Sequence, residues 1–103
     1  MKVWIGIYEH KYGVDAVAYA SEQLALEGLA STAMQQLKDD AAFDIGEMDP
    51  RSDAEAMVTI TKMHTAYAEQ RWSDVIGMYV DMASWWGMLS ESMEIIQSEV
   101  VGL

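Results

Sequence analysis

The stretch Lys2–Tyr19, KVWIGIYEHKYGVDAVAY, decides the fold of this chain. Residues 2–8 alternate as in a half-buried strand, with one set of side chains on each face of a sheet, Val3, Ile5 and Ile7 against Trp4, Gly6 and Tyr8. Residues 14–20 are a second run with β-branched and aromatic members. The polar residues 9–13 between the runs end in glycine and suit a loop of about five residues. The stretch therefore predicts a β-hairpin, and we expect the Val3 set to face the rest of the fold.

Three helices are predicted after this hairpin. Ser21 has the side chain of a helix cap, and apolar residues recur at helical spacing over residues 22–38. Gly28 lies inside this helix, where glycine costs up to ~1 kcal/mol relative to alanine, and close packing on the sheet would explain it. The spacing of Ser52–Glu55 is that of a capping box and predicts the start of a second helix. A third helix is predicted from Ser73, with a wide apolar stripe.

The end of the chain fits a helix or a strand. A hairpin alone is marginally stable in water, so a third strand at about residues 92–101 is the prediction that completes the sheet. The expected architecture is α+β, a small antiparallel sheet made of the N-terminal hairpin and the C-terminal strand, with two or three helices packed on one face. With 103 residues, we expect a single domain over residues 1–103.

Acidic residues are concentrated in two segments of the chain. Residues 39–55 contain seven acids and one base, residues 74–103 contain five acids and no base, and the formal net charge of the whole chain is −11. Such a field repels nucleic acid and anionic membrane and attracts basic surfaces. Half of the residues are apolar, there is no cysteine, and no apolar run of ~18 residues occurs, so we expect a globular cytoplasmic protein.

Sequence motifs for catalysis or cofactor binding are not found. His10 and His64 are the only imidazoles, and neither belongs to a zinc-binding pair. The glycines form no phosphate-binding loop, and the acids of residues 44–53 have only a generic spacing for a loose Ca²⁺ site. We expect no enzyme activity, no cofactor and no metal. The nine methionines are expected mainly to fill the core.

Aromatic side chains are the candidate anchors of a protein interface. If Val3, Ile5 and Ile7 face the helices, Trp4 and Tyr8 lie on the opposite, open face of the sheet. Trp85 and Trp86 are neighbours on a helix and point about 100° apart, so Trp85 is expected at the edge of the buried stripe or outside it. The alternative for Trp4 and Tyr8 is pairing across the sheet with Val17 and Tyr19.

Both ends of the chain resemble a class of small proteins. Residues 1–15, the run Ala18–Glu22 leading into a helix, and the closing segment Glu91–Val100 are similar to small acidic accessory proteins of phages and plasmids. The likeness covers about 35 residues. Some of these proteins inhibit host defence, including anti-CRISPR and anti-restriction proteins. The resemblance implies no catalytic residues.

Together these features predict a non-enzymatic acidic binding protein. The first hypothesis is a phage- or mobile-element-encoded inhibitor, anti-CRISPR-like, that occupies a basic nucleic-acid-binding surface of a bacterial defence complex in the host cytoplasm, because carboxylates spread over one face imitate the charge of DNA. It would bind neither nucleic acid nor membrane directly, and would be a monomer or a homodimer. The residues expected to contact the partner are Asp39, Asp40, Asp44, Glu47, Asp49, Asp53, Trp4, Tyr8 and Trp85.

Two other hypotheses stay open. In one, the chain is a homo-oligomeric structural or regulatory interaction module in which the aromatic face of the hairpin pairs with itself and the acids only maintain solubility. In the other, it is a small metal- or ligand-binding protein.

Overall fold

The computed structural model describes residues 1–39, 50–85 and 91–99. They form three strands and three helices in the predicted order, β1 (Lys2–His10), β2 (Gly13–Tyr19), α1 (Glu22–Asp39), α2 (Pro50–Ala68), α3 (Trp72–Trp85) and β3 (Ser92–Glu99). The α+β prediction is confirmed, and so is the closing strand.

The three strands form one antiparallel sheet in the order β2-β1-β3, so the first strand of the chain is central. Ile5 lies opposite Ala18 on one side and Ile96 on the other. The hairpin is tighter than predicted, because β1 continues to His10, which pairs with Gly13. Lys11 and Tyr12 alone make the turn. Gly13 has a φ of 135°, a conformation that other residues rarely adopt, so glycine permits this short turn.

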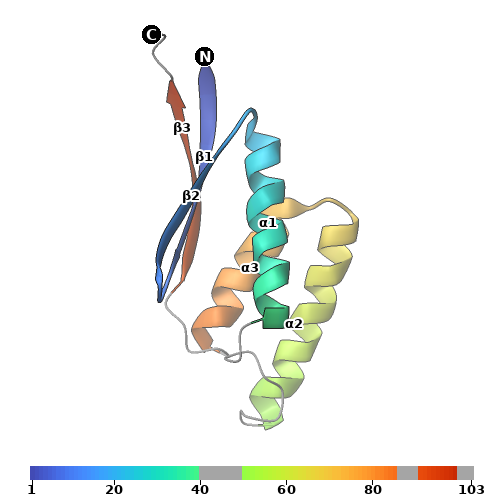
Figure 1. Ribbon diagram of the computed structural model, residues 1–103. Helices are drawn as coiled ribbons and strands as arrows, with labels where there is room; N and C mark the ends of the chain where they lie inside the picture. Colours follow the sequence, from blue (N-terminus) through green and yellow to red (C-terminus); the bar gives the residue numbers. More distant parts are fainter. Residues whose placement is uncertain (40–49, 86–90, 100–103) are drawn as a thin grey trace.

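The helices all lie on one side of the sheet (Figure 1). α1 packs against all three strands and α3 packs against β3, while α2 packs mainly on α3, away from the sheet. A hydrogen bond of 2.8 Å between the hydroxyl groups of Ser31 and Tyr67 ties α1 to α2. None of the helices in the described parts of the chain combines the length and the apolar character that crossing a bilayer requires.

The helix starts follow local signals with one exception. The Ser21 hydroxyl accepts a hydrogen bond of 3.2 Å from the backbone N–H of Leu24, so the predicted cap of α1 is confirmed. α2 begins at Pro50, two residues before the predicted capping box, so the predicted start at Ser52 is wrong. Proline is favoured at the first helical position because its φ is fixed near the helical value.

The prediction of which side of β1 faces the helices is wrong. Gly6 and Tyr8 are buried under the helical layer, while Val3, Ile5 and Ile7 belong to the opposite face. Gly6 has no side chain, so Leu29 of α1 approaches closely, and a Cβ built at Gly6 would lie 3.4 Å from its Cγ. The smallest residue of the strand therefore marks the side on which the helices pack.

The core beneath the sheet is built from small and flexible side chains. Its fully buried large residues are Tyr79, Met63, Met82 and Val75. Alanines fill the rest and let the helices approach one another, at positions 30, 33, 56, 66 and 83. Met63 and Met82 thus fill the core as predicted, whereas Met57 is 46% exposed.

Candidate functional site

Two tyrosines from different elements share one carboxylate where the core meets the sheet. The hydroxyl of Tyr8 donates to Oε1 of Glu91 at 2.7 Å, and the hydroxyl of Tyr79 donates to Oε2 at 2.5 Å. The two hydroxyl oxygens are 3.4 Å apart. This carboxylate clamp (Tyr8, Tyr79 and Glu91) connects β1, α3 and the residue that precedes β3.

The environment of the clamp keeps the phenol of Tyr79 protonated. Burial and the hydrogen bond to Glu91 raise the pKa of Tyr79 well above its usual value near 10. Tyr79 therefore acts as a donor to the carboxylate at every physiological pH. Since both oxygens of Glu91 accept a phenol, the arrangement joins elements and offers no free base at this point.

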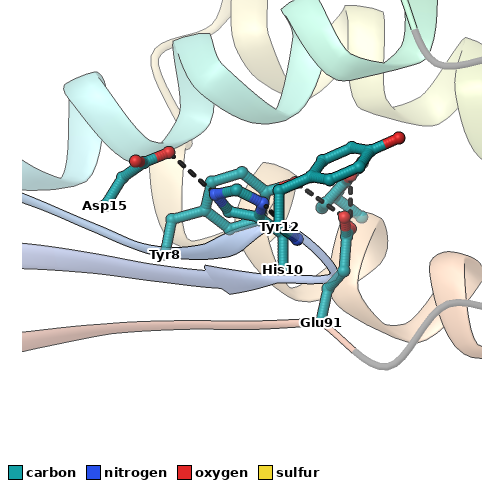
Figure 2. Close-up of polar contacts among 6 residues, drawn as sticks. Tyr8, His10, Tyr12, Asp15 and Glu91 are labelled. Atoms are coloured by element: carbon teal, nitrogen blue, oxygen red, sulfur yellow. Dashed lines mark hydrogen bonds and ion pairs between the residues drawn. The ribbon is translucent and has the colours of Figure 1, made fainter.

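A second polar group lies beside the clamp on the hairpin (Figure 2). Nε2 of His10 is 2.9 Å from Oδ2 of Asp15, and Nδ1 of His10 accepts the backbone N–H of Tyr12 at 3.3 Å. The imidazole packs on the ring of Tyr8, with centroids 4.7 Å apart. Because Nδ1 is an acceptor, the proton of the neutral ring is on Nε2 and points to Asp15. Both nitrogens of His10 are therefore engaged in holding the turn.

These groups do not form a reactive constellation. The histidine and the carboxylate that could exchange protons each have their partners within the fold. In residues 1–39, 50–85 and 91–99, no three His, Asp or Glu side chains gather as metal ligands would. The described polar contacts at this end of the sheet join elements of the fold.

The far side of the sheet carries apolar side chains that the helices do not cover. We call it the open sheet face. Residues directly opposite one another in a sheet share a face, so Ile5 and Ile7 of β1 lie beside residues of both outer strands. Its apolar members are Val3, Ile5, Ile7, Val14, Ala16, Ala18 and Ile96. None of them belongs to the core cluster, and the helices cover only the other side (Figure 1).

Carboxylates gather at the end of the molecule that contains the hairpin turn, the end of α3 and the start of β3. We call this the acidic end, and its described acids are Glu9, Asp15, Asp81, Glu91 and Glu94. Asp81 and Glu91 line the same hollow between α3 and β3. α1 ends and α2 begins toward this end too (Figure 1).

The three predicted aromatic anchors are not exposed. Tyr8 is only 4% exposed and lies in the core, and Trp4 is half-buried on the same side of the sheet. The expectation of an open aromatic face is therefore wrong, because the helices pack on the side of the sheet that carries Trp4 and Tyr8. Trp4 does lie opposite Tyr19, the cross-strand partner in the alternative, whereas Val17 lies opposite Gly6. Trp85 is half-buried at the end of α3 and packs against the core.

The six predicted acidic contacts lie outside what the structure describes. Asp40, Asp44, Glu47 and Asp49 fall in residues 40–49, as does most of the generic Ca²⁺ spacing. Asp39 ends α1 and Asp53 lies in α2, and the side chains of both are outside the described set.

Comparison with known proteins gave no relative: no family model, no curated protein and no solved structure matches the chain.

Sequence reasoning missed the clamp and the open sheet face. The signal for the face was available, since a glycine within an apolar strand marks close approach of another backbone. The contact between His10 and Asp15 also had a sequence signal, because the two residues flank the predicted turn. The clamp had none, since Glu91 and Tyr79 meet only after the chain has turned between α3 and β3.

Proposed function

We propose that this chain is a non-enzymatic acidic binding protein whose acidic end occupies a basic surface of a nucleic-acid-binding complex. The observation that supports this is the gathering of carboxylates from β1, β2, α3 and β3 at one end of the molecule. The sequence adds seven further acids in residues 39–55. A surface of this kind attracts the same cationic groups that bind nucleic-acid phosphates.

The biological setting is suggested by the resemblance of both ends of the chain to small acidic accessory proteins of phages and plasmids. A protein that fills a nucleic-acid channel without being cut or read acts as a competitive inhibitor. We therefore propose a role in inhibiting a bacterial nucleic-acid-targeting defence complex, in the host cytoplasm. The engaged state of His10 and Glu91 supports binding without catalysis.

The test uses two charge-reversal variants with the same change in net charge. Asp15→Lys/Asp81→Lys alters the acidic end, and Glu27→Lys/Glu99→Lys alters exposed acids away from it. Each tagged protein is used to capture partners from bacterial lysate at low and at high salt. The affinity of each variant for the identified partner is then measured.

We expect a nucleic-acid-binding protein that is retained at low salt, released at high salt and displaced by duplex DNA. The acidic-end variant should bind it at least ~10-fold more weakly and the control variant within ~3-fold of the parent, because electrostatic contacts act locally. Equal losses in both variants, or a partner that DNA does not displace, would refute the proposal.

The alternative, a homo-oligomeric module without nucleic-acid mimicry, is favoured by a different observation, the open sheet face.

A further inference from the structure

We propose that the open sheet face binds the same face of a second copy of this chain, giving a two-fold symmetric dimer. This goes beyond the proposed function, because the surface, the chemistry and the partner all differ from those of the acidic end.

The face has an aliphatic centre on β1 and β2 that continues onto β3 at Ile96. Its apolar residues extend over all three strands, and Val14 and Ile96 are 60% and 45% exposed. Its polar described residues are Glu9, Ser92, Glu94 and Ser98, which leave the row formed by Ala18, Ile5 and Ile96 aliphatic on all three strands. Exposed apolar surface that is continuous across a sheet is typical of a contact with another protein surface.

The size of the face fits a weak but specific dimer. Nine residues at ~3.3 Å and three strands at ~4.8 Å give a flat area of about 30 by 15 Å, or ~450 Å² per copy. Two copies bury about 900 Å² before the relief of the side chains is counted, which brings the interface toward the ~1,200 Å² lower end of specific complexes. A reversible dimer in the micromolar range is therefore expected.

The shape of the face selects a second copy as the occupant. Small side chains, Ala16 and Ala18, lie on the β2 side, and the larger Ile96 lies on the β3 side, with Ile5 between Ala18 and Ile96. A two-fold axis parallel to the strands places Ile96 of each copy over Ala18 of the partner subunit. Each copy therefore has both the projection and the hollow that the other needs, as an isologous interface requires.

The same axis brings the acidic ends of both copies to one side. Glu9 and Glu94 of the two copies then approach, so repulsion opposes the dimer at low ionic strength. Salt screens this repulsion and should strengthen the dimer. Binding of a basic partner by the acidic end should weaken with salt, so the two proposals have opposite salt dependence and fail independently.

The test is sedimentation equilibrium of the full chain between about 1 and about 100 µM, the range expected for an interface of this size. Ile96→Glu places a charge in the centre of the contact and should weaken the dimer at least ~10-fold. Val58→Glu is the matched control, because Val58 is a β-branched residue that is 56% exposed on α2, away from the sheet. It should leave the dimer unchanged. Circular dichroism confirms that each variant is folded.

A size exchange tests the arrangement itself. Ile96→Ala should weaken the dimer more than ~10-fold, because the lost methyl and methylene groups occur twice. The double variant Ile96→Ala/Ala18→Ile moves the projection to the other strand and should restore the affinity to within ~3-fold.

Three results would overturn the proposal. The first is a parent chain that stays monomeric at every concentration and salt, which would mean that another segment or another protein covers the face. The second is a dimer that survives Ile96→Glu, which would place the contact elsewhere, for example at a sheet edge. The third is failure of the exchange variant to recover.

Discussion

We predict that Gly28→Ala destabilises the protein, although alanine normally stabilises a helix relative to glycine. A Cβ built at Gly28 would lie 2.1 Å from the Tyr19 hydroxyl oxygen, 2.5 Å from Cζ and 2.9 Å from Cε1. The whole edge of the ring would have to move by more than an ångström. Tyr19 is half-buried in β2 beside Trp4, so this movement disturbs the contact between α1 and the sheet.

The size of the effect is a balance of two terms. Alanine gains about 1 kcal/mol over glycine inside a helix. Overpacking of this kind costs typically 1–3 kcal/mol, and the hydroxyl oxygen and two ring carbons within 3 Å indicate the upper part of that range. We expect Gly28→Ala to lower the free energy of unfolding by about 1–2 kcal/mol. For a domain of this size, that corresponds to a Tm lower by roughly 4–16 °C.

Gly77 provides the matched control. It also lies inside a helix, but a Cβ there meets nothing within 4 Å. Gly77→Ala should therefore raise the free energy of unfolding by about 1 kcal/mol. In a Tyr19→Ala background the obstacle is gone, and Gly28→Ala should become stabilising by a similar amount. Thermal and urea unfolding measure all variants. If Gly28→Ala stabilises the parent chain as much as Gly77→Ala does, Tyr19 does not pack on Gly28.

Three further predictions concern the polar groups near the hairpin. Tyr79→Phe removes a hydrogen bond to a carboxylate and should lower the free energy of unfolding in urea by about 1.5–3 kcal/mol. The control Tyr12→Phe, at a residue that is 83% exposed, should change it by less than ~0.5 kcal/mol. Equal losses in the two variants would show that the clamp does not stabilise the fold. The raised pKa of Tyr79 keeps its phenol protonated in the folded chain, whereas the unfolded chain loses that proton near pH 10. The contribution of Tyr79 to the free energy of unfolding is therefore complete below pH 10 and falls at higher pH, by up to ~1.4 kcal/mol per pH unit. In pH-dependent unfolding the parent should show this steeper decline and Tyr79→Phe should not; parallel profiles would contradict it. Asp15→Asn should cost less than ~1 kcal/mol, because Asp15 is exposed and its pairing with His10 is screened by water, and a larger loss in thermal unfolding would give that pair a greater role.

The elements of the fold could be predicted from the sequence, but the face of the sheet could not be read from hydropathy alone. Both sets of alternating residues in β1 are apolar, so the Ile and Val set and the Trp and Tyr set compete equally for the core. The helices pack on the Trp and Tyr side because Gly6 allows Leu29 to approach the strand there. On the same side, the hydroxyl of Tyr8 donates a hydrogen bond to Glu91 inside the fold. The same inversion turned the expected aromatic surface into an aliphatic one.

The predicted ends of strands and helices were wrong where two local sequence signals competed. The five polar residues of the hairpin loop resembled a longer connection, but the pairing of His10 with Gly13 extends the strand across two of them and glycine closes the turn. At the start of α2, the fixed φ of Pro50 begins the helix before the serine that the capping pattern favours. The clamp joins residues that only the assembled sheet brings together, and no local pattern marks such a contact.

The central position of β1 has a consequence for how the protein is made. β1 is synthesised shortly before β2 and pairs with it early, yet its other edge stays without a neighbour until β3 has been synthesised. The pairing of Lys2 with Glu99 closes almost the full length of the chain. Until then the nascent protein has a strand edge with unpaired backbone hydrogen-bonding groups next to an uncovered aliphatic surface. Such a combination favours aggregation and binding to chaperones.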